Sequence, residues 1–244
     1  MALPYTLEVA ANSVASAIAA QQGGASRVEL CSALELGGIT PSVAQIAMAR
    51  EHVHIPLYVL IRPRAGDFLY TDLECEQMQR DIETCEALGC DGVVIGVLNA
   101  EGDVDVARCK SLMNAVGRMG VTFHRAFDLT RDLERALEDL ITLGVERVLT
   151  SGGQVSAIDG AMTLRKLVTQ GIGCISVMPG AGISATNIAG LVATTGAREF
   201  HASAKRQLPS GMQYQRPALD DMEAGEIRSD AAQIADMVAA LRRL

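Results

Sequence analysis

The sequence Gly144-Val-Glu-Arg-Val148 belongs to a short pattern that recurs along the chain. Its other copies are Gly24-Ala-Ser-Arg-Val28, Gly89-Cys-Asp-Gly-Val93 and Gly196-Ala-Arg-Glu-Phe200. In each copy the glycine follows an amphipathic stretch and precedes a short apolar run. This order is typical of a left-handed glycine that ends a helix, followed by a buried strand. Successive copies lie about two βα units apart, at roughly 30 residues a unit.

The segments between these copies complete a pattern of eight strands, each followed by a helix. We predict strands at 6–9, 27–30, 57–61, 92–95, 121–124, 147–149, 174–178 and 199–201. We predict helices at 13–22, 42–51, 72–88, 105–116, 132–143, 155–169, 186–195 and 229–244, with N-caps at Ser13, Ser42, Asp72 and Asp132. The pattern indicates an α/β fold: a single (βα)8 TIM-type barrel domain over residues 1–244. An open, doubly wound sheet is the alternative.

Two connections are longer than the others, at 62–71 after the third strand and at about 205–228 after the eighth. Both follow strand ends, at the rim where barrel enzymes carry their catalytic residues. The second is rich in proline, glycine and charge. Two roles remain as alternatives for this connection: a lid over the barrel or an arm in a dimer.

Composition excludes several classes of partner. The chain has 49% hydrophobic residues, a net charge of −8 and no run of Lys or Arg, so we expect no nucleic acid partner. Its apolar runs are far shorter than the ~20 residues of a membrane span, and the N-terminus lacks a basic signal-peptide segment. The six cysteines form no CxxC pair. Together these features predict a cytoplasmic protein with reduced thiols and no membrane partner.

Two glutamates lie in matching sequence on the first two strands, in Leu7-Glu8-Val9 and Val28-Glu29-Leu30. Side chains alternate along a strand, so both carboxylates should point into the barrel near its mouth. Two close carboxylates raise the pKa of one of them, which is how general acid–base pairs arise. The other interpretation is a buried structural pair that Arg62 neutralises.

Two histidines end predicted strands, His124 on the fifth and His201 on the eighth. The eighth strand neighbours the first in a closed barrel. One histidine would be an ordinary core residue, but two at equivalent strand ends would share the interior with both glutamates. We therefore interpret Glu8, Glu29, Arg62, His124 and His201 as candidate catalytic residues.

A further set has donors suited to a carboxylate or a phosphate. Guanidinium groups bind such anions through two parallel hydrogen bonds, and the loops after strands seven and eight often bind phosphate through backbone N–H groups. The candidate anion-binding residues are Arg64, Arg125, Ser151, Gly180, Gly182 and Ser203.

These motifs resemble those of the CutC family, whose members are called copper homeostasis proteins. The resemblance runs nearly end to end. It depends on Arg27-Val-Glu-Leu-Cys31, Gly37-Gly-Ile-Thr-Pro-Ser42, Ile61-Arg-Pro-Arg-Ala-Gly-Asp-Phe68, Thr122-Phe-His-Arg-Ala-Phe-Asp128, Arg147-Val-Leu-Thr-Ser-Gly152 and Gly180-Ala-Gly182 before Asn187.

The resemblance implies a TIM-type barrel, a cytoplasmic location, and a homodimer or higher homo-oligomer. It also implies a role in copper homeostasis with Cu(I) binding, for which Cys31 is the candidate metal ligand. Family members often have a cysteine at the end of the first strand, where this chain has Ala10. This departure argues against a copper site with two thiolates at the rim.

Three hypotheses follow. In the first, the chain is a CutC-like protein of copper homeostasis that binds Cu(I) through Cys31, since soft Cu(I) prefers sulfur ligands. In the second, it is an enzyme that acts on a small phosphorylated or carboxylated metabolite. Glu29 and His124 would then exchange protons while Arg62 and Arg125 hold a carboxylate. The third is a scaffold without chemistry.

Overall fold

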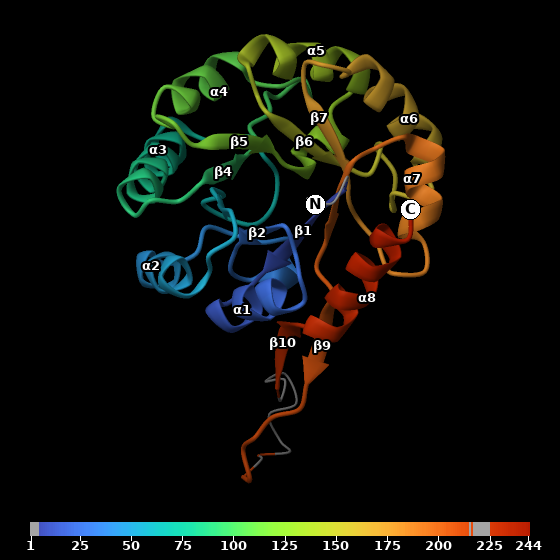
Figure 1. The fold of residues 1–244 in the computed structure, drawn as a ribbon. Helices are drawn as coiled ribbons and strands as arrows, with labels where there is room; N and C mark the ends of the chain where they lie inside the picture. Colours follow the sequence, from blue (N-terminus) through green and yellow to red (C-terminus); the bar gives the residue numbers. More distant parts are fainter. Residues whose placement is uncertain (1–4, 215, 217–224) are drawn as a thin grey trace.

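The computed structural model describes residues 5–214, 216 and 225–244. Eight parallel strands form one sheet in the order β7-β6-β5-β4-β3-β2-β1-β8, so the last strand pairs with the first. At its two ends β7 and β8 lie side by side without a hydrogen-bonded ladder between them. The strands are β1 (Thr6–Ala11), β2 (Arg27–Leu30), β3 (Leu57–Leu60), β4 (Gly92–Ile95), β5 (Gly120–Phe123), β6 (Arg147–Thr150), β7 (Ser176–Pro179) and β8 (Glu199–Ala202). The sheet is therefore a nearly closed barrel (Figure 1), and the predicted fold is confirmed over the open alternative.

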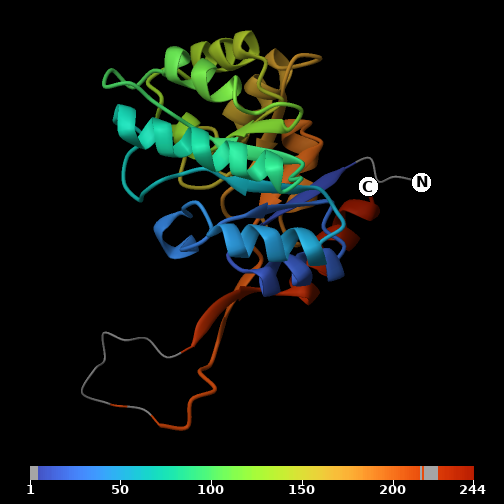
Figure 2. The ribbon, with the colours of Figure 1, turned by 90° about the vertical axis from the view of Figure 1, so that its left-hand side faces the viewer.

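Helices surround this barrel and cover the outer face of the strands (Figures 1 and 2). They are α1 (Val14–Gln22), α2 (Val43–His52), α3 (Asp72–Ala87), α4 (Val106–Met113), α5 (Leu133–Leu143), α6 (Ala161–Gln170), α7 (Ile188–Thr195) and α8 (Ala231–Arg242). Apolar residues between strands and helices make the core, among them the fully buried Phe123 and Phe200. No helix in the described part of the chain is both long and apolar enough to cross a membrane.

The recurring glycines behave as the sequence predicts. Gly24, Gly89, Gly144 and Gly196 all have φ between 72° and 85°, in the left-handed region that glycine tolerates. Each lies at or just after a helix end and is followed by a buried strand. The N-caps Ser13, Ser42 and Asp132 are confirmed, because each side chain accepts a backbone N–H of the first turn. The third cap is Thr71 instead of Asp72, because Thr71 forms a capping box with Glu74.

Some predicted boundaries are wrong. Helix α6 begins at Ala161 instead of residue 155, because residues 152–160 form a run of bends and turns in which Gly160 lies against the carbonyl of Ser151. Strand β7 starts at Ser176 instead of residue 174. Two short 3-10 helices, η1 (Leu34–Leu36) and η2 (Arg125–Leu129), follow β2 and β5 and were not predicted.

The long connection after β8 contains an antiparallel pair, β9 (Lys205–Leu208) and β10 (Glu226–Ser229). Hydrogen bonds from Asn12 to the Ile227 carbonyl and from the Ser229 backbone N–H to Ser16 join β10 to the start of α1. The pair extends away from the barrel instead of across its interior (Figures 1 and 2). Residues 215 and 217–224 of the predicted 205–228 loop lie outside the described part of the chain.

Candidate functional site

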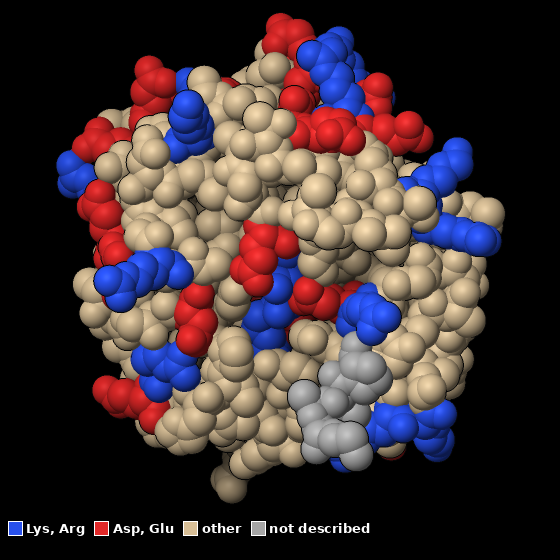
Figure 3. Space-filling model, turned by 45° about the horizontal axis from the view of Figure 1, so that its top comes forward, with Lys and Arg blue, Asp and Glu red and all other residues tan. Residues whose placement is uncertain are grey.

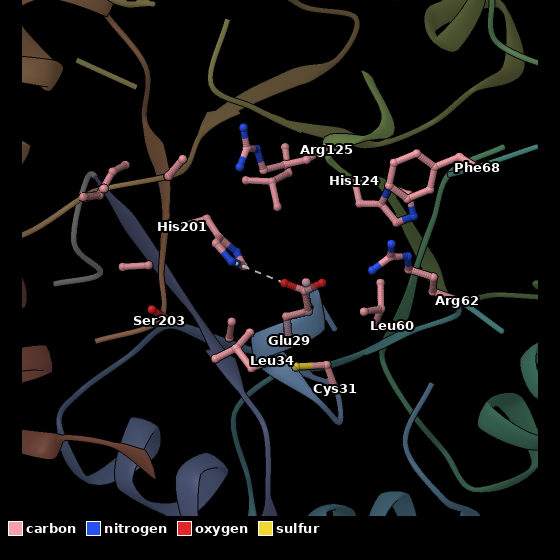
Figure 4. A pocket seen from close by; sticks show the side chains of 17 residues that line it. Glu29, Cys31, Leu34, Leu60, Arg62, Phe68, His124, Arg125, His201 and Ser203 are labelled. Atoms are coloured by element: carbon pink, nitrogen blue, oxygen red, sulfur yellow. Dashed lines mark ion pairs between the residues drawn. The ribbon is translucent and has the colours of Figure 1, made fainter. Parts of the chain in front are cut away.

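A pocket of about 280 Å³ lies where the barrel strands end, which is a volume suited to a small molecule. Glu29, Arg62, His124 and His201 line it, as do Arg125, Gly182, Ser203 and Cys31 from the other predicted sets. The side chains labelled in Figure 4 reach it from different strands and from the loops that follow them. Of the remaining candidates, Glu8 lies deeper in the barrel, and Arg64, Ser151 and Gly180 do not line the pocket.

Glu29, His201 and Glu8 form a continuous chain of contacts. His201 Nδ1 lies 2.8 Å from a carboxylate oxygen of Glu8, and its Nε2 lies 3.4 Å from one of Glu29. Figure 4 shows the Glu29 carboxylate directed into the pocket with the His201 ring beside it. The predicted proximity of the two glutamates is thus realised through the imidazole, because Glu8 is paired across the strands with Arg27 and His201 instead of Glu29.

The pKa shifts of these three residues differ in direction. Burial raises the pKa of Glu29 to about 7, and the negative charge of Glu8 adds to this while His201 opposes it. Burial would also raise the pKa of Glu8, but Arg27, His201 and Arg147 outweigh it and hold that pKa at about 2. Burial lowers the pKa of His201, yet Glu29 and Glu8 reverse the direction, so it is raised. A proton can therefore reside near neutral pH on either member of the Glu29–His201 pair.

Below the pocket lies a network of paired charges whose members, apart from Glu8, were not predicted. Arg27 donates to Glu8 and, at 2.7 Å, to Glu199, and Arg147 donates to the same oxygen of Glu199 at 2.6 Å. Both guanidinium groups also lie over the ring of Tyr58. Figure 3, which looks toward the end where the strands begin, shows acidic and basic side chains gathered in a hollow. Alternation would have found these residues, since Arg27 and Glu199 each lie two positions before a residue that lines the pocket.

His124 follows β5 and lies on the pocket wall opposite His201 (Figure 4). Its Nδ1 accepts the backbone N–H of Ala126 at 3.1 Å, and its Nε2 is buried with no partner among the described residues. Burial, together with the charge of Arg62, lowers the pKa of His124 to about 3. The hypothesis that His124 exchanges protons with Glu29 is therefore not the one this geometry favours. His201 is the imidazole that contacts Glu29.

Arg62 is 6% exposed and holds the loops around the pocket together. Its terminal nitrogens donate to the carbonyls of Leu36, Gly38 and Gly66, and its guanidinium lies over the ring of Phe68. None of the ion pairs in the described part of the chain includes Arg62, so the interpretation that it neutralises the glutamates is wrong. Arg27 has that role for Glu8. Arg62 therefore gives the pocket a positive charge without a carboxylate directly on it.

Of the four other predicted anion-binding residues, Arg125 lines the pocket, whereas Arg64, Ser151 and Gly180 do not. Arg125 reaches the pocket edge, where it pairs with Asp128 and donates to Ser151 at 2.9 Å. Ser151 is fully buried under this pair. Arg64 is tied to Glu74 and Asp67 on the outside of the pocket, and Gly180 packs against Leu149 beneath it.

Three non-glycine residues in the described part of the chain have positive φ, and all lie next to the pocket: Ala33 (49°), Ala181 (75°) and Ala204 (43°). Ala181 itself lines the pocket, while Ala33 and Ala204 adjoin the lining residues Leu34 and Ser203. Such conformations are strained for residues with a Cβ and collect at functional sites.

The residues around Cys31 do not fit Cu(I). Cys31 is 2% exposed and packs with Leu60 and Val94, and burial raises its pKa well above the usual range. Among the described residues, one group of three side chains brings possible ligand atoms within 4.8 Å of one another: Glu8, Glu29 and His201. This group contains no sulfur, which Cu(I) prefers, and Glu8 is already bound by Arg27 and His201.

Comparisons with known proteins agree with one another. The family model described as the CutC family matches residues 5–206. A Xanthomonas campestris pv. campestris (strain 8004) protein named "family protein CutC" is 52% identical over 236 residues, which cover 97% of this chain and 98% of that protein. A Chromobacterium violaceum protein with the same name is 56% identical over 210 residues, covering 86% of this chain and 85% of that one.

Solved structures support both the fold and the family. A Streptococcus agalactiae protein, provisionally named copper homeostasis protein CutC, matches with a TM-score of 0.78 and 31% identity, covering 81% of this chain and 97% of that one. Phosphoribosylanthranilate isomerase from Thermotoga maritima matches with a TM-score of 0.61 at 9% identity, covering 98% of this chain and 100% of that one, which concerns the fold alone. The chain belongs to the CutC family.

Proposed function

We propose that this chain is an enzyme that transfers protons to and from a small, negatively charged metabolite at the mouth of the barrel. Glu29 and His201 are the groups that exchange protons with the substrate. The observation that carries the proposal is their contact at 3.4 Å inside a pocket of about 280 Å³. General acid–base groups work best when their pKa lies near the working pH, and the pKa of Glu29 is about 7.

The negative charge of the substrate is inferred from Arg62. A buried cation without a counter-charge is costly, so an anion in the pocket would supply a missing interaction. Gly182 and Ser203 line the same pocket from the loops after β7 and β8, which commonly bind phosphate in barrels. Arg125 adds a second guanidinium at the edge. A phosphate or a carboxylate on the substrate fits these donors.

The test is a thermal-shift screen at pH 7 with phosphate- and carboxylate-bearing metabolites, followed by a turnover assay on those that stabilise the chain. We expect Glu29→Gln to bind the same compound but to lose about 10²- to 10⁴-fold in kcat. Glu76→Gln is the matched control, because Glu76 is an exposed residue of α3 whose one ion pair among the described residues is with Arg80. A screen in which no compound stabilises the chain, or a Glu29→Gln variant with full kcat, would refute the proposal.

Direct copper binding is the second candidate, supported by the name of the Streptococcus agalactiae relative. Cys31 would be its sulfur ligand, although the residues around it do not suit Cu(I). Titration with Cu(I) against a competing chelator decides the matter. Submicromolar binding that Cys31→Ser abolishes would establish copper handling, and binding that is absent, or unaffected by that change, would exclude this site.

We also propose a cytoplasmic location and assembly as a homodimer or a higher homo-oligomer. All six cysteines are unpaired, as expected in a reducing compartment. The β9–β10 pair extends beyond the barrel and is a feature available for contact with a second copy. Sedimentation analysis of the purified chain measures the assembly directly.

A further inference from the structure

The imidazole of His124 is a polar group that the proposed proton exchange does not use. Its Nδ1 accepts a hydrogen bond from the backbone N–H of Ala126. A backbone N–H can only donate, so Nδ1 carries no hydrogen and the hydrogen of the neutral ring is on Nε2. Nε2 is therefore a donor, and no acceptor within the described residues reaches it.

The surroundings hold this ring in one orientation. Gly96, just after β4, lies directly against it, since a Cβ at that position would be 2.2 Å from the ring carbon Cε1. Phe68 packs on the ring with centroids 4.8 Å apart. The position of the donor is thus set by three separate segments: the end of β5 with the turn at Ala126, the end of β4, and the loop that contains Phe68.

The ring also stays neutral. His124 is 5% exposed and the Arg62 guanidinium lies near it, and both the burial and this charge disfavour an imidazolium. A neutral Nε2–H suits the stabilisation of a developing oxyanion, because it donates a hydrogen bond without giving up its proton.

Leaving a buried donor unpaired destabilises a folded protein, so native structures rarely contain one without a purpose. His124 lines the same pocket as Glu29, whose carboxylate points into the space between His124 and His201 (Figure 4). A substrate atom that accepts from His124 would therefore lie in the pocket that holds the proton-exchanging carboxylate.

We propose that His124 Nε2–H donates a hydrogen bond to a carbonyl oxygen of the substrate while Glu29 removes a proton from the adjacent carbon. The substrate class is then a small anion that carries a carbonyl group next to a C–H bond. This inference depends on the proposed function and names its reaction: proton transfer through an enolate.

The electron balance needs no other reactant. The Glu29 carboxylate takes the proton, the C–H electron pair forms the C=C bond of the enolate, and the carbonyl π pair moves to oxygen, where His124 stabilises it. Return of a proton from Glu29 to the same carbon restores the ketone or aldehyde and regenerates the carboxylate, so turnover of this sequence is measured as exchange of that C–H hydrogen with solvent deuterium. His201, held by Glu8, is placed to stabilise the Glu29 carboxylate before the first step and after the second.

The test uses two planar enolate mimics as probes: phosphoglycolohydroxamate for a phosphate-bearing substrate and oxalate for a 2-oxo acid. We expect one of them to bind the wild-type chain, and His124→Leu to weaken that binding by on the order of tenfold to a hundredfold, the effect of one strong hydrogen bond. His124→Gln, which retains a side-chain N–H donor, should recover most of the affinity. Two results would overturn the inference: neither probe binds the wild-type chain, or His124→Leu binds as tightly as wild type.

A second measurement needs no ligand and separates the two proposals. Nitrogen-15 NMR of the imidazoles should show His124 as a neutral ring protonated at Nε2 between pH 5 and pH 8. Protonation at Nδ1, or a charged ring in this range, would remove the donor and overturn the inference while leaving the Glu29–His201 exchange intact. If Glu29 and His201 did not exchange protons with the substrate, the Glu29→Gln variant would instead retain full kcat.

Discussion

At the end of the barrel where the strands begin, Arg27 and Arg147 share Glu199, and Arg27 also binds Glu8. At the end where the strands stop, Arg62 donates only to backbone carbonyls and the Nε2 of His124 has no acceptor within the described residues. Both ends are buried and polar. They differ in pairing: the lower network satisfies its charges internally, whereas the pocket leaves a cation and a donor available to a ligand. The contrast separates charges that stabilise the fold from groups available for chemistry.

The largest expected effect comes from breaking the paired end. Arg27→Met removes one partner from Glu8 and one from Glu199, so that the fully buried carboxylate of Glu8 loses its guanidinium and retains only His201 among the described residues. We expect a loss of ~3–5 kcal/mol in the free energy of unfolding, measured by urea denaturation at pH 7. A loss below about 1 kcal/mol, the usual value of an exposed pair, would mean that this network does not support the fold.

Replacing Glu29 or Glu8 by Gln should change the pH dependence of stability in different ways. The folded-state pKa of Glu29 is about 7, above the usual 4.5, so its contribution to stability is complete below pH 4.5 and is lost as the pH rises through 7. Glu29→Gln should remove this loss, which we place on the order of 2–3 kcal/mol between pH 5 and pH 8.5. Denaturation at both pH values measures it, and an unchanged pH dependence in the variant would contradict the raised pKa.

Glu8→Gln is the control for that experiment. The pKa of Glu8 is held at about 2, so its contribution is present above pH 4.5 and is lost only as the pH falls toward 2. The variant should therefore be less stable than wild type at both pH 5 and pH 8.5, with no gain at the higher pH. Equal behaviour of Glu8→Gln and Glu29→Gln would show that the two carboxylates share one environment.

A smaller effect is expected at Gly96, whose backbone lies directly against the His124 ring. Gly96→Ala places a Cβ against the His124 ring, which should shift the ring, cost about 1–3 kcal/mol in stability and weaken binding of the enolate mimic. Gly190→Ala is the matched control, since a Cβ there has open space and lies within α7. It should stabilise the chain by about 0.5–1 kcal/mol and leave binding unchanged. Full binding by Gly96→Ala would show that the ring position is not critical.

The smallest effect is expected at Arg64, which the sequence analysis placed among the anion-binding residues. Its guanidinium is 38% exposed and pairs with Glu74 and Asp67 outside the pocket. Arg64→Ala should cost no more than about 1 kcal/mol in unfolding free energy, and kcat/KM should not change. A clear rise in KM would restore Arg64 to the substrate site.

Much of the architecture was predictable because it depends on local patterns. The recurring glycines and apolar runs predicted the number and order of the eight barrel strands, though not the β9–β10 pair, and alternation directed Glu29 and His201 inward. Helix boundaries failed where tertiary contact decided them, as at residues 152–160, where the approach of Gly160 to the Ser151 carbonyl replaces a helical turn. The family resemblance, confirmed by the comparisons, did not identify which imidazole contacts Glu29.

By itself the sequence determined that Glu8 and Glu29 would face the interior, because each occupies the inward position of a strand that alternates every second residue. It could not determine their charge states, since the surrounding sequence is nearly the same for both. Only the tertiary structure set Glu8 against Arg27 and set Glu29 at the pocket beside His201, 172 residues away in sequence. The pKa of a carboxyl group depends on its burial and on the nearest opposite charge. Both are set by the register of the paired strands and by the closing of the barrel, which no local sequence pattern encodes.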